Sequence, residues 1–406
     1  MNAAPPTCVD VAIAGGGMVG ASLALALADT DKRVMLIEAV APGGTDQPSF
    51  DDRTSALGNG SRRILETLGV WRHLAGHAGA VREIRVSDAR HIGAARISAA
   101  EQGLEALGYV VPNRSIGAAL WRQLGHCPQI IVRCPARVSA VHLGPDGARL
   151  TLAADGAGAE SIEARVVVAA DGALSMVRAA AGIGAAVEDY RQVAVVVHLA
   201  TDLPSSDVAY ERFTTTGPLA VLPLPDGRYT VVWTLAPERA QQVLALDEGG
   251  FCSELQRCFG WRIGRILRAG LRSSYPLRLS RAEGMVGARA VLVGNAAQAL
   301  HPVAGQGFNL GIRDCACLVD CLARSPLGQP GGAVAGPDPL QALHRYAARR
   351  RLDRTLLPAL TSALPRVFSS TLGPVVLARS AALLGMDLLP ALRRPFTRLL
   401  MYGAPR

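Results

Sequence analysis

The stretch CVDVAIAGGGMVGASLALALAD, residues 8–29, decides the fold of this chain. An apolar run leads into three consecutive glycines and a second apolar run follows, which predicts a strand, a tight turn and a helix. Residues 32–39, KRVMLIEA, predict a second strand that ends at Glu38. A strand, a helix and a strand in this order open a doubly wound parallel sheet, so we expect an α/β fold.

The glycines of this stretch have the spacing G-x-G-x-x-G. Gly15 permits the tight turn, Gly17 lets a pyrophosphate approach the backbone at the helix N-terminus, and Gly20 allows the helix to pack closely on the sheet. Glu38 follows at the end of the second strand, where a carboxylate can accept from both ribose hydroxyls. A structural glycine turn is the alternative. The strand, the helix and the acid together favour a dinucleotide without a 2′-phosphate, such as FAD.

A second segment, VVVAADGALSMVR, covers residues 166–178. Asp171 and Gly172 end a buried strand, and Ser175 and Arg178 follow at helical spacing. An ordinary strand-to-helix turn with an aspartate cap would give the same pattern, so this segment alone does not decide between the two interpretations.

A third segment, VLVGNAAQALHPVAGQGFNLGIR, covers residues 291–313. Asn295 offers an acceptor for sugar hydroxyls, and the backbone N–H groups of residues 305–309 begin a helix and can face a negative ring edge. A reduced flavin carries negative charge at such an edge. The three segments together suggest one flavin that is held at three points.

Composition limits the partners of the chain. Only 4% of its 406 residues are aromatic, so a base-stacking surface is not expected and we predict no nucleic-acid partner. The net charge of +9 is either a solvated basic surface or an attraction to anionic lipid or an anionic cofactor. No Lys or Arg precedes the first apolar run, which argues against a signal peptide and predicts a cytoplasmic protein.

Three of the eight cysteines, Cys315, Cys317 and Cys321, lie close together in the sequence. Cys315 and Cys317 are expected on different faces of a helix, and no His follows at zinc-finger spacing. We therefore interpret them as small buried helix residues and predict no metal site.

The chain divides into three predicted regions. A discontinuous Rossmann-like FAD-binding domain is expected from residues 1–80, 113–186 and 281–325. Short alternating runs in residues 81–112 and 187–280 predict an inserted substrate domain with a mixed or antiparallel β-sheet. Residues 326–406 are expected to be a helical C-terminal region.

Together the three segments resemble the GxGxxG, DG and GD motifs of FAD-dependent aromatic hydroxylases with the p-hydroxybenzoate hydroxylase fold, over essentially the whole chain. Within this class, further stretches are similar to the ubiquinone-biosynthesis hydroxylases, and most of all to the 2-octaprenyl-6-methoxyphenol hydroxylase branch. These stretches are residues 51–71, 108–114, 210–235 and 294–314.

The resemblance implies a function and a set of FAD-binding residues. Such an enzyme hydroxylates the ring of a polyprenylated phenol with O₂ and NAD(P)H, through a flavin C4a-hydroperoxide, and can belong to a ubiquinone-biosynthesis complex. The residues implied in cofactor binding are Gly15, Gly17, Gly20 and Glu38 for the ADP half, Arg53 and Arg114 for the pyrophosphate or ribityl region, Asp171 and Gly172 for FAD and the approach of NAD(P)H, and Asn295, Gly305, Gly307, Phe308 and Asn309 for the ribityl chain and isoalloxazine. Surface salt bridges are the alternative for the two arginines.

Two features of the third segment allow alternative interpretations. His301, beside Pro302, is the candidate catalytic base, although a structural hydrogen-bonding role is the alternative. The wider family has Gly-Asp-Ala-Ala-His where this chain has Gly294-Asn295-Ala296-Ala297-Gln298, a variant that we associate with the 6-methoxyphenol branch. A flavin reductase, a halogenase, a hydroxylase of another substrate or a non-catalytic FAD-binding subunit are the competing functions. The chain has no Trp-x-Trp-x-x-Pro halogenase signature.

Residues 355–406 are apolar and basic. Arg379 and Asp387 interrupt them, so they are not expected to span a bilayer. We expect helices packed on the body, a peripheral membrane surface for a polyprenyl substrate, or both.

Overall fold

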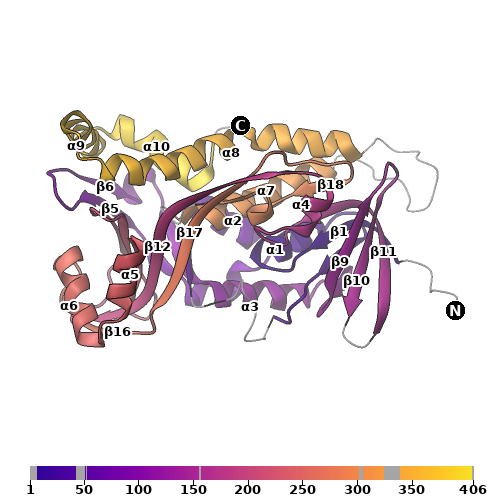
Figure 1. Cartoon of the computed structure of the whole chain (residues 1–406), viewed down its shortest axis with the longest axis horizontal. Coiled ribbons are helices and arrows are strands. Elements are labelled where there is room, and N and C mark those ends of the chain that lie inside the picture. Colours follow the sequence, from indigo (N-terminus) through magenta and orange to yellow (C-terminus); the bar gives the residue numbers. More distant parts are fainter. Residues whose placement is uncertain are drawn as a thin grey trace.

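The computed structural model of the chain describes residues 7–42, 51, 53–154, 157–300, 305–323 and 339–404 (Figure 1). Two large sheets and one small sheet form its framework, and three helices follow one another at the C-terminal end. This agrees with the predicted α/β class.

The first sheet has seven strands in the order β8-β2-β1-β11-β10-β9, with β18 also paired to β11. The pairs that join β8, β2, β1, β11 and β18 are parallel, and β9 and β10 continue the sheet in antiparallel fashion. The strands are β1 (Thr7–Ala14), β2 (Val34–Ile37), β8 (Ile130–Arg133), β9 (Arg137–Leu143), β10 (Ala148–Ala154), β11 (Ala157–Ala169) and β18 (Ala290–Leu292).

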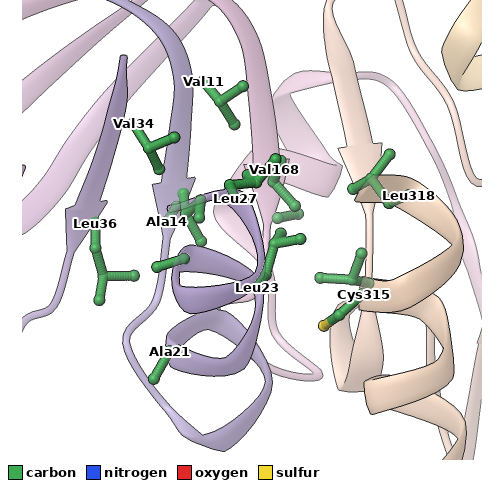
Figure 2. Packing of buried hydrophobic residues seen from close by; sticks show 14 of the residues in the cluster. Val11, Ala14, Ala21, Leu23, Leu27, Val34, Leu36, Val168, Cys315 and Leu318 are labelled. Atoms are coloured by element: carbon green, nitrogen blue, oxygen red, sulfur yellow. The ribbon is translucent and has the colours of Figure 1, made fainter. Parts of the chain in front are cut away.

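Helices cover this sheet and bury a continuous apolar core. They are α1 (Met18–Leu27), α2 (Asn59–Thr67), α3 (Asn113–Leu124), α4 (Met176–Ala180) and α7 (Gln306–Ala323). Figure 2 shows Leu23 of α1 between the sheet residue Val168 and the α7 residues Cys315 and Leu318. The cysteines of α7 are buried core residues, as the sequence predicted.

The second sheet has nine strands in the order β19-β17-β12-β15-β14-β13-β5-β6, with β16 paired to β12. It is mostly antiparallel, but β13 and β5 pair in parallel, so the sheet is mixed. The strands are β5 (Glu83–Asp88), β6 (Ala94–Ser98), β12 (Ala185–Thr201), β13 (Val208–Phe213), β14 (Pro218–Pro223), β15 (Tyr229–Leu235), β16 (Ile266–Ala269), β17 (Ser273–Ala282) and β19 (Gln298–Ala299). A three-stranded sheet of β3 (Thr54–Gly58), β7 (Gly108–Pro112) and β4 (Gly79–Val81) completes the framework.

Helices lie on both sides of the second sheet. Helices α5 (Pro237–Leu244) and α6 (Glu248–Phe259) pack on one face around Trp233 and Phe251. The C-terminal helices α8 (Pro339–Ser369), α9 (Gly373–Leu388) and α10 (Pro390–Tyr402) run along the top of the molecule in Figure 1, and α9 packs on β6. The rings of Phe213 in β13 and Phe368 in α8 stack with centroids 3.8 Å apart.

Most predicted elements are confirmed; the sequence of residues 113–124, for example, predicts a helix, and α3 spans these residues. The amphipathic pattern from Ser61 to Leu74 also predicts a helix; the structure confirms a helix there, but α2 ends at Thr67 and not at Leu74. Gly69 there adopts a φ of +70°, and the N–H of Val70 donates to the Leu65 carbonyl, which closes the helix. Helices α5 and α6, within residues 187–280, were not predicted from the sequence. Strand β7, expected in the substrate sheet, pairs with β3 and β4 instead.

Candidate active site

The carboxyl ends of three adjacent parallel strands meet at one edge of the first sheet. Gly15 follows β1, Glu38 follows β2, and Asp171 lies two residues beyond β11. The backbone joins these ends, since Gly15 N–H donates to the Ile37 carbonyl (2.8 Å) and Ala170 N–H to the Ala14 carbonyl (2.8 Å). In doubly wound sheets, ligands bind at this edge.

The fingerprint glycines are required by close approach. Gly15 has a φ of +100°, and a Cβ there would lie 2.5 Å from the Ala170 carbonyl oxygen. A Cβ on Gly20 would collide with the carbonyl oxygen of Gly15, because α1 passes directly behind the turn. Side chains are therefore excluded where a dinucleotide needs bare backbone.

Gly16 is a further position that the sequence analysis did not single out. Its N–H donates to Glu38 Oε2 at 2.6 Å, and its carbonyl accepts from Trp121 Nε1 at 3.1 Å. A Cβ at Gly16 would lie 2.8 Å from the Cβ of Glu38 and 2.9 Å from Trp121 Cζ2. The other carboxylate oxygen of Glu38 accepts from the N–H of Val40 at 2.8 Å. These bonds clamp the glycine loop between β2 and α3.

Only one of the two carboxylate oxygens of Asp171 has a hydrogen-bond partner among the described residues. Its Oδ2 accepts from the N–H of Met176 at 2.8 Å, whereas its Oδ1 is buried and has no partner among the described residues. The guanidinium of Arg178 donates to the Ala296 carbonyl at 3.0 Å and to the Ala173 carbonyl at 2.8 Å. The second and third sequence segments are thereby joined. An orphaned buried acceptor at this edge suits a ligand that donates a hydrogen bond.

The third segment enters the site through the start of α7. Gly305 has a φ of +58°, and a Cβ there would lie 2.7 Å from the Cβ of Ala56. The Asn309 amide is used entirely within the protein, since its oxygen accepts from Gly58 N–H and Ser61 Oγ and its nitrogen donates to the carbonyls of Ala56 and Gly305. What remains for a ligand is the set of first-turn N–H groups of α7, which favour negative charge.

A charged cluster buried beneath α7 fixes this helix to α8. Arg350 pairs with Asp314 at 2.7 Å and also with Asp353, and Arg313 lies 3.7 Å from Asp353. Desolvation raises the pKa of Asp314, although Arg350 opposes the shift. Desolvation also lowers the pKa of Arg313 to about 10. The cluster holds the start of α7 in place from behind.

One cavity of about 1300 Å³ connects these groups with the second sheet and the C-terminal helices. This exceeds the roughly 300–1,000 Å³ of a typical single-ligand pocket. The cavity has a polar half at the strand ends of the first sheet. Its apolar half lies between the second sheet and α8–α10, where Val196, Ala220, Leu364, Leu383 and Met401 are among its lining residues.

The structure brings most of the predicted site residues to this cavity. Those that line it are Gly15, Gly17, Glu38, Arg53, Asp171, Gly172, Asn295, Gly305, Gly307, Phe308 and Asn309. Gly20 is buried behind the turn. Arg114 is exposed on α3 and does not line the cavity, whereas its neighbour Asn113 does. His301 and Pro302 lie outside the described residues.

Arg53 reaches the cavity from the end of the small sheet. Its guanidinium lies over the Tyr275 ring, 4.7 Å from the centroid, and pairs with Asp51. This arrangement joins the N-terminal end of β3 to β17 on the wall of the cavity.

The sequence of the chain matches a known family of proteins over most of its length. The model of the FAD binding domain family matches residues 8–335. The ubiquinone hydroxylase UbiL of Rhodospirillum rubrum is 39% identical over 391 residues, which are 96% of this chain and 88% of the relative. The chain belongs to the FAD-dependent hydroxylases of ubiquinone biosynthesis.

Other members and neighbours of this hydroxylase family agree. The 3-demethoxyubiquinol 3-hydroxylase of Escherichia coli is 34% identical over 397 residues, 95% of this chain and 96% of the relative. The crystal structure of p-nitrophenol 4-monooxygenase PnpA from Pseudomonas putida superposes with a TM-score of 0.79 at 18% identity, over 98% of this chain and all of that one, and shows the shared fold. The predicted family, fold class, enzyme class and FAD cofactor are confirmed.

Two negative findings apply to the described residues. None of their helices is by itself long and apolar enough to cross a membrane, although α8 and α9, bent by 119° at their junction, pass that test as a pair. No group of three His, Cys, Asp or Glu side chains among them could hold a metal ion.

Proposed function

We propose that this hydroxylase acts on the ring of a polyprenylated phenol. One ring C–H becomes C–OH, O₂ supplies the oxygen atom, and NAD(P)H with a proton supplies the hydrogen that reduces the second oxygen atom to water. One observation carries the proposal: the polar half at the strand ends and the apolar half beneath α8–α10 are parts of the same cavity. The polar half suits a dinucleotide, and the apolar half suits a ring with a prenyl chain.

The residues of the polar half are assigned to FAD as follows. Gly15, Gly17 and Gly20 leave the backbone bare for the pyrophosphate, and Glu38 serves the adenosine ribose. Asn295 and the N–H groups at the start of α7 serve the ribityl chain and the flavin ring. The orphaned Oδ1 of Asp171 accepts a hydrogen bond from the cofactor. Bound FAD supplies the redox chemistry with O₂.

The chain's own contribution is to position the phenol and exclude water. The apolar lining desolvates the ring, and the second sheet and α8–α10 enclose it. The domain division proposed from the sequence follows the same logic. Residues 1–80, 113–186 and 281–325 would form the FAD-binding domain, and residues 81–112 and 187–280 the substrate domain. Residues 326–406 would form the C-terminal region, whose helices α8–α10 border the apolar half.

The test is a hydroxylation assay with purified holoenzyme. Substrate-stimulated NAD(P)H oxidation that yields a hydroxylated prenylphenol, identified by mass spectrometry, supports the proposal. Bound FAD without turnover on any prenylphenol would instead favour a non-catalytic FAD-binding subunit. Protein that takes up no FAD would overturn both.

We also propose that the ring position is that of the 6-methoxyphenol branch, on the strength of the Asn295 and Gln298 variant. One relative is named for hydroxylation at position 3, so overall similarity does not decide the position. Deletion of the gene and identification of the accumulating quinone precursor tests this assignment. Accumulation of a 6-methoxyphenol precursor supports it, and any other precursor contradicts it.

A peripheral membrane contact through α9 and α10 would deliver the prenyl chain. Leu377, Leu388 and Leu392 are 72%, 73% and 56% exposed, and Arg394 and Arg398 are exposed on the same pair of helices. Other residues of these helices line the apolar half of the cavity. An apolar surface beside exposed arginines suits an anionic bilayer.

Flotation with anionic liposomes tests this surface. Leu377→Glu with Leu388→Glu should abolish co-flotation while FAD binding persists. Leu271→Glu is the matched control, because Leu271 is 83% exposed but lies beside the second sheet, before β17. Equal flotation of all three proteins would contradict the proposed contact.

A further inference from the structure

Glu211 is a carboxylic acid on a mostly apolar wall of the cavity. It lies in β13, where successive side chains point to opposite faces of the sheet, so it shares its face with Ala209 and Phe213. All three residues line the cavity. On the neighbouring strands, Val86 of β5 and Ala220 of β14 lie opposite Glu211.

Nothing in the described part of the chain neutralises this carboxyl group. Its Oε1 is shielded from solvent and has no hydrogen-bond partner there. The adjacent cation, Arg212, is turned to the other face of the sheet, where its Nε donates to the Cys258 carbonyl at 3.1 Å. The buried guanidinium of Arg379, which also lines the cavity, is paired with Asp88 at 2.9 Å.

A carboxyl group with a buried oxygen that lacks a hydrogen-bond partner is costly for the fold. Burial raises the pKa of Glu211 to about 7. Both its charged and its neutral form are therefore populated near neutral pH, which suits a group that accepts and returns a proton. Titratable groups whose pKa values are shifted in this way occur most often at functional sites.

We propose that Glu211 is a catalytic residue that binds the hydroxyl group of the phenol. Its carboxylate accepts the phenol O–H hydrogen bond and takes the proton, so the O–H bond breaks and its electron pair stays on the oxygen. This raises the electron density at the ortho and para ring carbons, where oxygen adds. Glu211 then returns the proton to the product oxygen, and the ring C–H proton leaves to solvent.

This role rests on the proposed function, and the geometry explains why Glu211 suits it. The other charged side chains that line the apolar end of the cavity, Arg278 and Arg379, can only donate hydrogen bonds. The apolar residues opposite Glu211 leave it no competing donor. A neutral phenol is therefore a partner that satisfies the carboxylate without bringing a second charge into the cavity.

The experiment compares binding of two probes to the FAD-loaded protein. The probes are a geranylated phenol and its O-methyl ether, which cannot donate a hydrogen bond. Wild-type protein should bind the phenol at least about 10-fold more tightly. Glu211→Leu should remove this preference. Glu211→Gln keeps an acceptor oxygen, so it should retain part of the preference but lose about 100-fold or more in kcat.

Controls separate recognition from folding. Glu83→Gln should leave both readouts unchanged, because Glu83 is a partly buried glutamate on the adjacent strand β5 that is paired with the exposed Arg85. The Tm of Glu211→Leu should equal or exceed that of the wild type, because a buried unpartnered acid is removed. A fall in Tm, or an unchanged phenol preference in Glu211→Leu, would overturn the proposal.

The same measurements distinguish failure of the proposed function from failure of the proposed role of Glu211. A wild-type protein that hydroxylates prenylphenols while Glu211→Leu binds and turns over normally contradicts only the role of Glu211. A wild-type protein that never hydroxylates a prenylphenol but shows a Glu211-dependent preference contradicts the proposed function and the proton transfer, and supports phenol recognition.

Discussion

In the polar half of the cavity, the proposed dinucleotide end, the backbone fixes the position of each group. In the apolar half, the proposed substrate end, side chains from distant segments do so. Gly15, Gly16 and Gly20 have no room for a Cβ, and caps and carbonyl contacts hold the turns. The substrate end is assembled from strands of the second sheet and from α8–α10. At the substrate end, apolar packing between side chains, such as the stack of Phe213 on Phe368, takes the role that close backbone contacts have at the dinucleotide end.

The comparison predicts that the two ends differ in their tolerance of substitution. A single added carbon should disable the dinucleotide end, because backbone atoms cannot move aside. The substrate end should tolerate changes of size and polarity better, and some should stabilise the fold.

The largest effect is expected for Gly20→Val. The new side chain would collide with the Gly15 carbonyl, so we expect a loss of stability above about 4 kcal/mol and no FAD retained after purification. Soluble yield, Tm and flavin absorbance measure this. Gly249→Ala in α6 is the control, since nothing lies within 4 Å of its Cβ position and a gain of up to about 1 kcal/mol is expected. A yellow, stable Gly20→Val protein would contradict the backbone argument.

Arg350→Met should cost about 3–5 kcal/mol, because it leaves Asp314 as an uncompensated buried charge beneath α7 and leaves Asp353 with the more distant Arg313 as its cation. Its sequence neighbour provides the control. Arg349 pairs with Asp320 at the surface and is 40% exposed, so Arg349→Met should cost less than about 1 kcal/mol. Denaturant unfolding measures the free energy of unfolding of both variants. Equal losses would show that burial of the charged cluster does not increase its contribution to stability.

The pH dependence of stability should reveal Glu211 at the substrate end. Burial raises its pKa from 4.5 to about 7, so the unfolded chain releases this proton at a lower pH than the folded chain does. Wild-type stability should therefore fall by about 1–3 kcal/mol as pH rises from 4.5 to 7, relative to Glu211→Leu. Denaturant titrations of both holoproteins at pH 5 and pH 8 measure the difference. Parallel pH profiles would mean that the carboxyl group is solvated.

The smallest effect is expected for Trp121→Phe, which removes the 3.1 Å hydrogen bond to the Gly16 carbonyl and keeps an aromatic ring. We expect a loss of about 0.5–1.5 kcal/mol in the free energy of FAD binding, which corresponds to an increase in the Kd for FAD of about 2- to 10-fold. Fluorescence titration of the apoprotein with FAD measures it. An unchanged Kd would show that the glycine loop is held by Glu38 alone.

The sequence predicted the dinucleotide end residue by residue because its signals are local. Glycine spacing, an acid after the second strand and an Asp-Gly at a strand end describe backbone geometry within a few residues. Arg114 shows the limit of such prediction, since the neighbouring Asn113 lines the cavity instead. The predicted end of α2 at Leu74 was wrong for a related reason, because the conformation of Gly69 closes the helix earlier.

Glu211 carried a weak signal that was missed. In the strand sequence VAYERF, the alternation that places Ala209 and Phe213 on one face also places Glu211 there. A charged residue on an apolar face is informative when the burial of that face is known. The sequence alone does not say whether the face is covered by helices, by a cavity or by water.

By itself, the sequence determined the family, the parallel sheet with its glycine turn, the FAD cofactor and the order of the cofactor segments, because each follows from contacts between residues close in the chain or from whole-chain similarity. The tertiary structure decided which side chains share the cavity, that the Asn309 amide is used within the protein, and that Glu211 faces the apolar half without a partner among the described residues. Those features depend on how segments hundreds of residues apart pack together, and local sequence patterns do not encode that packing.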